Sequence, residues 1–186
     1  MLPRVYVAIA GPATIEVDLT AKETNMGSSS VNDPQPNLGK VVRLSADHPP
    51  GQDAAFRQAH KNARQYLTGH EWVLGIDEEY LGAAINGIIY IFLFKIRPAR
   101  ADVDSWLWVI VGDLPPAYLT CDDCKTAAEA LDGYIGAMES WVAAAIEGRS
   151  VAGLIPVNVP ANRENAEMLK SRLEFLDKKI LPLLKN

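Results

Sequence analysis

Short apolar segments separated by turn residues fill the middle of the chain. Residues 71–76, 80–85, 88–96 and 106–111 are rich in β-branched or aromatic residues, which is typical of strands. The dipeptide Asn86-Gly87 separates two of them, and both residues tolerate the positive φ of a tight hairpin turn. Connections this short join antiparallel neighbours, because a parallel crossover needs a dozen or more residues. The pattern predicts an antiparallel meander sheet over about residues 71–112.

Apolar residues at helical spacing predict one helix before this sheet and one after it. Residues 53–67 repeat with this period, and Gly69 then provides a stop. Residues 122–147 carry a long apolar face, and Thr120 or Asp122 can cap the helix.

A second C-terminal helix is expected over residues 162–180, with Pro182 disrupting its last turn. Its apolar residues recur at gaps of three and four, which suits docking onto the sheet or the preceding helix. A coiled-coil seam that forms a homodimer is the alternative. These apolar residues are Ala166, Leu169, Leu173, Leu176, Ile180 and Leu183. A run of strands followed by helices predicts the α+β class, with the meander packed by helices 53–67, 122–147 and 162–180.

The first forty residues differ in composition from the rest. Residues 1–24 contain two short alternating segments that predict strands, whereas residues 25–39 are rich in Gly, Ser and Pro and predict a flexible loop or linker. Residues 1–24 are therefore a candidate appendage. Residues 40–186 are expected to form a single α+β domain, beginning with a short strand at 40–44.

Composition narrows the class of protein. Of 186 residues, 48% are hydrophobic and 22% charged, which is typical of a folded globular domain. The two cysteines exclude a scaffold built from disulfides. A net charge of −5 disfavours nucleic-acid binding, which needs clustered Lys and Arg. The longest apolar region, residues 81–94, is shorter than the roughly 20 residues of a membrane span. We expect a cytoplasmic protein without a membrane partner.

The segment Cys121-Asp122-Asp123-Cys124 is the only named motif. A C-x-x-C at a helix start can lower a thiol pKa and support disulfide exchange, although two intervening aspartates disfavour thiolate. One such pair also supplies only two of the four ligands of structural zinc. A helix start with two incidental thiols is the favoured interpretation, and Cys121 and Cys124 remain the redox alternative.

Other recognisable chemistry is missing from the sequence. The histidines His48, His60 and His70 form no H-E-x-x-H or chelating pair. The chain also contains no P-loop, G-x-G-x-x-G or G-x-S-x-G motif. We expect no catalytic residue, no cofactor and no metal site, while a site built from distant residues stays open.

Charge is distributed unevenly along the chain. Residues 71–150 hold 13 acidic and 5 basic side chains. Such an acidic surface would attract a basic partner and speed the encounter. The candidate contact residues are Asp77, Glu78, Glu79, Asp122 and Asp123.

The leading hypothesis is a non-enzymatic protein-binding domain that engages a basic protein. One concrete form is a bacterial immunity protein that masks a nuclease-type toxin, since such a toxin must be basic to hold phosphate. The alternatives are a small enzyme, either thiol–disulfide or a hydrolase with a dispersed site, and a homodimeric structural component that pairs through its last helix.

Overall fold

The computed structural model describes residues 35–44 and 53–185. The predictions for residues 1–24 and for most of the linker lie outside the described residues. The elements, in chain order, are η1 (Leu38–Lys40), β1 (Val42–Arg43), α1 (Ala54–Thr68), β2 (Val73–Ile85), β3 (Ile89–Pro98), β4 (Trp106–Gly112), β5 (Ala117–Thr120), α2 (Ala127–Ile146), α3 (Arg163–Phe175), η2 (Leu176–Ile180) and α4 (Leu181–Leu184).

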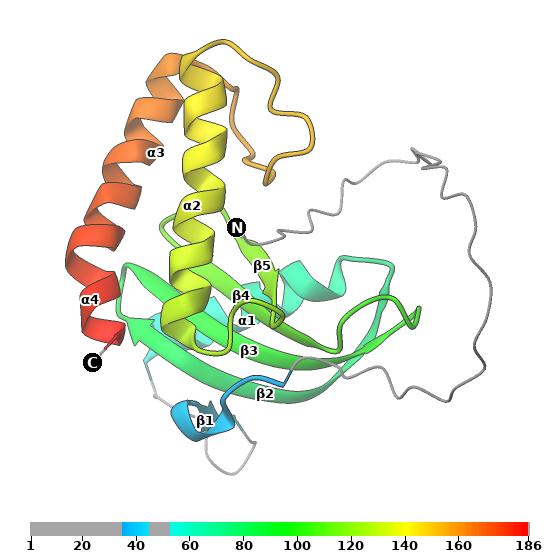
Figure 1. Ribbon diagram of the computed structural model, residues 1–186. Helices are drawn as coiled ribbons and strands as arrows, with labels where there is room; N and C mark the ends of the chain where they lie inside the picture. Colours follow the sequence, from blue (N-terminus) through cyan, green and yellow to red (C-terminus); the bar gives the residue numbers. More distant parts are fainter. Residues whose placement is uncertain (1–34, 45–52, 186) are drawn as a thin grey trace.

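The five strands form one antiparallel sheet in the order β1-β2-β3-β4-β5. Helix α1 covers one face of this sheet, while α2 and α3 lie on the other (Figure 1). The predicted α+β class, the meander and the helices on either side of it in sequence are confirmed.

The central strands β3 and β4 are buried on both faces, which gives the molecule two hydrophobic cores. Along β3, Tyr90, Phe92 and Phe94 pack with α1, while Ile91 and Leu93 pack with α2. Alternate residues of a strand point to opposite faces, so a nearly continuous apolar strand suits a layer between helices.

Strand β2 differs from its prediction as two strands. It runs unbroken from Val73 to Ile85, with three register shifts against β3, at Leu74, at Asp77 and at Gly82, and the acidic triplet Asp77-Glu78-Glu79 begins at the middle one. The triplet therefore lies within a strand and not at a strand junction. Bulges explain the error, because an extra residue interrupts the alternation that the sequence pattern relies on.

The hairpin turn between β2 and β3 lies where it was predicted. Gly87 has a φ of +73°, and the Ile88 N–H donates to the Ile85 carbonyl at 2.9 Å. Ile85 pairs with Ile89, so three residues separate the paired positions. The Asn86 side chain also accepts a hydrogen bond from the Tyr90 hydroxyl at 2.7 Å.

Helix α2 begins later than expected. Its N-cap is Thr126, whose side chain accepts from the Glu129 N–H while the Glu129 carboxylate accepts from the Thr126 N–H. This reciprocal capping box fixes the helix start. Strand β5 was not predicted, because the prolines at 115 and 116 read as a chain turn, and it pairs with β4 through four residues.

The C-terminal helix continues past Pro182 through a change of helix type. A π-turn, η2, separates α3 from α4, and the Leu181 N–H donates to the Leu176 carbonyl. Proline removes one backbone donor and crowds the carbonyl four residues earlier. The wider turn just before Pro182 accommodates both effects, so the expected break becomes a local widening.

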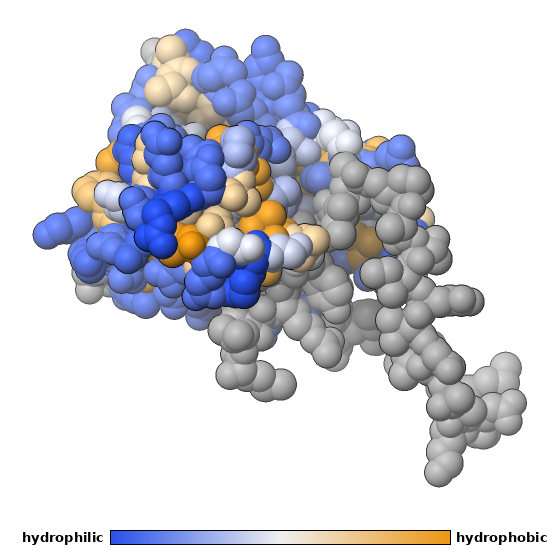
Figure 2. Space-filling view, turned by 90° about the horizontal axis from the view of Figure 1, so that it is seen from above, coloured by the Kyte–Doolittle hydropathy of each residue, from blue (hydrophilic) through white to orange (hydrophobic). Residues whose placement is uncertain are grey.

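Residues near the described N-terminus rest against the domain. Pro36 is buried, and the Asn37 N–H donates to the Lys125 carbonyl at 2.8 Å. In the part of the chain that the structure describes, no helix is both long and apolar enough to span a membrane. Figure 2 shows one face of the molecule, where hydrophobic patches lie between hydrophilic side chains.

Candidate functional site

The acidic triplet on β2 is surrounded by cations. Asp77 forms an ion pair with Arg97 at 2.9 Å. Glu78 lies 3.2 Å from Arg43 and 3.3 Å from Lys95. Two neighbouring strands, β1 and β3, therefore supply the countercharges of these carboxylates.

Glu78 also accepts a hydrogen bond from the Tyr80 hydroxyl at 2.6 Å. That hydrogen bond is the main reason why the pKa of Glu78 lies below its usual value; burial opposes it, and Lys95 and Arg43 lower the pKa further. The carboxylate is thus ionised and locally neutralised at neutral pH.

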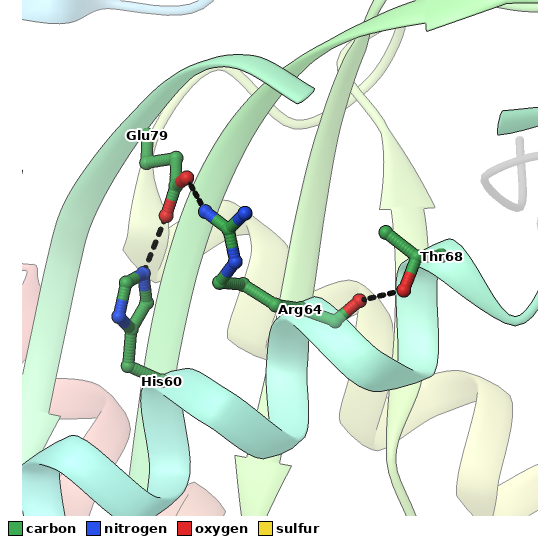
Figure 3. A network of polar contacts seen from close by, with 4 residues as sticks. All are labelled: His60, Arg64, Thr68 and Glu79. Carbon is green, nitrogen blue, oxygen red and sulfur yellow. Dashed lines mark hydrogen bonds and ion pairs between the residues drawn. The ribbon is translucent and has the colours of Figure 1, made fainter. Parts of the chain in front are cut away.

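The third member of the triplet, Glu79, points toward α1. Its carboxylate accepts from Nε2 of His60 at 2.5 Å and from the Arg64 guanidinium. Both donors lie one turn apart on α1, and the Thr68 hydroxyl continues the network by donating to the Arg64 carbonyl at 2.8 Å (Figure 3). The Glu79 side chain is only 16% exposed, so this network links the helix to the sheet.

His60 lies between this carboxylate and three phenylalanine rings. Its ring centroid lies 5.3 Å from that of Phe92, and Phe56 and Phe94 lie next to it. Burial lowers the pKa of His60, and the nearby Arg64 cation lowers it further. The neutral ring must carry its proton on Nε2, because a carboxylate only accepts hydrogen bonds.

The turn between β5 and α2 carries the C-x-x-C motif and two candidate acids. Both Cys121 and Cys124 are buried and neither forms a disulfide. Trp108 donates its indole N–H to the Cys124 carbonyl at 2.8 Å. The turn is therefore fastened to the core through a buried tryptophan of β4.

The Cys124 thiol is poorly suited to form thiolate. Burial raises its pKa to about 11, and the carboxylates of Glu129, Asp123 and Asp132 add to this, with Lys125 opposing them. Reactive cysteines have lowered pKa values and are partly exposed. The motif also precedes the helix, so its thiols do not occupy the first turn of α2.

Asp122 and Asp123 are exposed at this turn, and no ion pair joins either of them to another described residue. Asp123, Glu129 and Asp132 all act on the Cys124 thiol, which places them in one neighbourhood. Lys125 is the cation that acts there. We call Asp122, Asp123, Glu129 and Asp132 the β5–α2 acidic cluster.

Other acids of the central segment pair with the basic flanks of the chain. Asp113 lies 2.8 Å from Arg172 of α3, and Asp132 lies 3.7 Å from Lys185 beyond α4. The sequence-predicted acids are thus divided between two environments: the triplet is paired within the fold, and Asp122 and Asp123 face solvent.

A second histidine lies in an aromatic cluster at the end of α1. The His70 ring stacks on Trp72 at 5.0 Å and meets Tyr66 and Tyr118 edge-on. Its Nε2 atom is buried and has no hydrogen-bond partner among the described residues, and burial lowers the pKa of His70. The rings contact one another directly.

Sequence reasoning missed both histidine environments. The His60 network joins residues 15 to 19 positions apart, and only the packing of α1 on the sheet brings them together. The helical period did place His60 one turn after Phe56, on the side that packs. No sequence pattern predicts that this side of the helix contacts Glu79.

The described residues contain no group of three or more His, Cys, Asp or Glu side chains that could hold a metal ion. Comparisons with known proteins identify no relative: no family model, no curated protein and no solved structure matches this chain.

Proposed function

We propose that this chain is a non-enzymatic protein-binding domain that engages a basic protein partner through the β5–α2 acidic cluster. The observation that carries the proposal is that Asp122 and Asp123 are exposed and form no ion pair with any described residue, while the carboxylates of Glu129 and Asp132 lie in the same neighbourhood as Asp123. Unpaired carboxylates of one sign attract a positively charged surface and accelerate association.

The triplet Asp77-Glu78-Glu79 has a smaller part in this proposal than in the sequence-based hypothesis. Its three carboxylates contact five cationic or imidazole side chains of the same chain. A partner would first have to displace these contacts. Exchanging an ion pair within the chain for one with the partner would add little binding free energy, because surface ion pairs are weak. The main contact residues are therefore Asp122 and Asp123.

The position of the turn supports a binding role. The indole of Trp108 and the buried Cys124 hold the backbone in place, and the Thr126–Glu129 capping box fixes the helix behind it. A rigid turn loses little conformational entropy when a partner binds. An immunity protein that masks a basic nuclease-type toxin is one form that such a binder could take.

The thiol–disulfide alternative receives less support. Burial and neighbouring carboxylates raise the pKa of Cys124 to about 11, whereas disulfide exchange requires an accessible thiolate. A hydrolase with a dispersed site has no specific observation in its favour.

The proposal is tested by affinity capture with three baits from a lysate of the native cell. The baits are the wild-type chain, Asp122→Asn/Asp123→Asn, and the control Glu139→Gln/Asp177→Asn. The control removes the same charge from exposed residues on other elements.

We expect the wild type and the control to recover the same basic protein and the Asp122→Asn/Asp123→Asn bait to recover much less of it, as measured by quantitative mass spectrometry. Equal recovery by all three baits, or recovery of an acidic protein only, would contradict the proposal.

A further inference from the structure

Two large apolar side chains are exposed on the same side of α3. Met168 is 59% exposed and Phe175 is 43% exposed. They are seven residues apart, which is close to two helical turns, so they point in nearly the same direction. A shallow depression lined by Arg163, Glu164, Glu167, Met168 and Ser171 follows this side of the helix.

On the same side of the helix, a charged residue lies beyond each of these two apolar residues: Glu164 before Met168 and Lys179 after Phe175. At about 100° per residue, Glu164, Met168, Phe175 and Lys179 fall within an arc of about 60°. The π-turn η2 changes the direction of Lys179 by less than about a quarter turn, which keeps it on the same side. We call these four residues the outer stripe of α3.

The outer stripe points away from the rest of the molecule. The residues that bury α3 and η2 are Ala166, Leu169, Leu173, Leu176 and Ile180. Their mean direction is about 130° away from that of the outer stripe. The heptad-like seam seen in the sequence is therefore already occupied within the fold except at its last residue, Leu183, which is 60% exposed, and the outer stripe is a separate surface.

The outer stripe is symmetric about one point. Met168 and Phe175 are equidistant from the midpoint between Ser171 and Arg172, and so are Glu164 and Lys179. A two-fold axis through that point, perpendicular to the helix, places Met168 of one chain against Phe175 of the other. The same axis places Glu164 against Lys179, twice. An isologous dimer requires this kind of self-complementary surface.

The charges at both ends are available for such pairing. Glu164 and Lys179 have no ion pair with any described residue, whereas their neighbours are used within the helix. Arg163 pairs with Glu167, and Lys178 pairs with Glu174.

We propose that the outer stripe of α3 binds a second copy of this chain, with the two helices antiparallel. The helical segment from α3 to α4 is about 33 Å long, which offers a small interface, and the expected dissociation constant is about micromolar. The surface is distinct from the β5–α2 acidic cluster, so either proposal can fail without the other.

Charge reversal on the full-length chain tests both the contact and its direction. Glu164→Lys sets lysine against lysine in a homodimer, and Lys179→Glu sets glutamate against glutamate. We expect the dimer of each variant alone to have a dissociation constant at least about tenfold higher than that of the wild type. An equimolar mixture of the two should dimerise, because both cross-chain contacts are then Lys–Glu. The double variant Glu164→Lys/Lys179→Glu should also dimerise.

Sedimentation velocity over the micromolar concentration range measures these dimers, and circular dichroism verifies folding. The control Asp177→Lys reverses a charge on the opposite side of the same helix and should leave dimerisation unchanged. A wild-type chain that stays monomeric, single variants that dimerise like the wild type, or a mixture that fails to dimerise would each overturn the proposal.

Discussion

The imidazole of His60 lies between a pair of charged side chains, Glu79 and Arg64, and a group of aromatic rings. The Glu79 carboxylate accepts a hydrogen bond from the His60 N–H and forms an ion pair with Arg64, while the rings of Phe92 and Phe94 pack against the imidazole. A protonated ring would add a second cation beside Arg64 in a partly buried site. The neutral ring is therefore the form that the fold stabilises.

This environment predicts a specific pH dependence of stability. The folded-state pKa of His60 is lowered by burial and by Arg64, so on acidification the unfolded chain takes up the proton first. The free energy of unfolding should therefore fall between about pH 7.5 and about pH 5.5, through the ordinary histidine pKa. His60→Gln should reduce this fall, as measured by urea denaturation at both pH values.

His70, whose pKa is also lowered by burial, should retain part of the effect in the His60→Gln variant. The carboxyl of Glu78 has a lowered pKa and contributes only at more acidic pH. An unchanged pH dependence after His60→Gln would show that the fold does not disfavour the charged ring.

The two thiols should react slowly in the native protein. Cys121 and Cys124 are buried, and burial together with nearby carboxylates raises the pKa of Cys124 to about 11. A disulfide reagent such as Ellman's reagent at neutral pH should label them only after unfolding. Cys121→Ser assigns the remaining signal to Cys124. Rapid labelling of the native chain would revive the thiol–disulfide interpretation.

At the scale of elements, the contact between β2 and α2 depends on the absence of a side chain at Gly82. A Cβ atom there would lie 2.6 Å from the Trp108 ring and 3.0 Å from the Ala127 side chain. Trp108 is fully buried, and its indole N–H is held by the Cys124 carbonyl. The strand can approach the helix start only because residue 82 is glycine.

Gly82→Ala should therefore destabilise the protein by about 1–3 kcal/mol through overpacking. The matched control is Gly136→Ala, at a helical position of α2 with nothing within 4 Å of the added methyl group. That change should stabilise the fold by about 0.5–1 kcal/mol, because alanine has the better helix propensity. Chemical denaturation measures both, and equal effects would contradict the close packing at Gly82.

Elements with a strong local signal could be predicted from the sequence. Asp53 caps α1 by accepting from the Ala55 N–H at 2.9 Å, and Gly87 marks the β2–β3 turn. The start of α2 could have been found too, since Thr126 and Glu129 have the spacing of a capping box. The unbroken β2 could not, because its bulges depend on pairing with β3.

At the scale of the whole molecule, acidic and basic residues that lie in different segments of the sequence form ion pairs with one another in the fold. The acidic central segment supplies Glu79, Asp113 and Asp132, which pair with Arg64, Arg172 and Lys185 of the flanking helical segments. The sequence predicted which residues are acidic but not which ones remain unpaired. That distinction needs tertiary contacts, and it separates Asp122 and Asp123 from the triplet.

The proposed binding surface predicts how fast the partner associates. The decisive measurement is the association rate of the captured basic partner as a function of ionic strength. It should be made with the wild type, Asp122→Asn/Asp123→Asn and the control Glu139→Gln/Asp177→Asn. The wild-type rate should fall as salt rises, since salt screens exposed charges.

The Asp122→Asn/Asp123→Asn variant should associate about three- to tenfold more slowly at low salt, with a weaker salt dependence, and the control should follow the wild type. Identical rates and salt dependences for all three proteins would contradict the assignment of the β5–α2 acidic cluster as the surface that meets the partner.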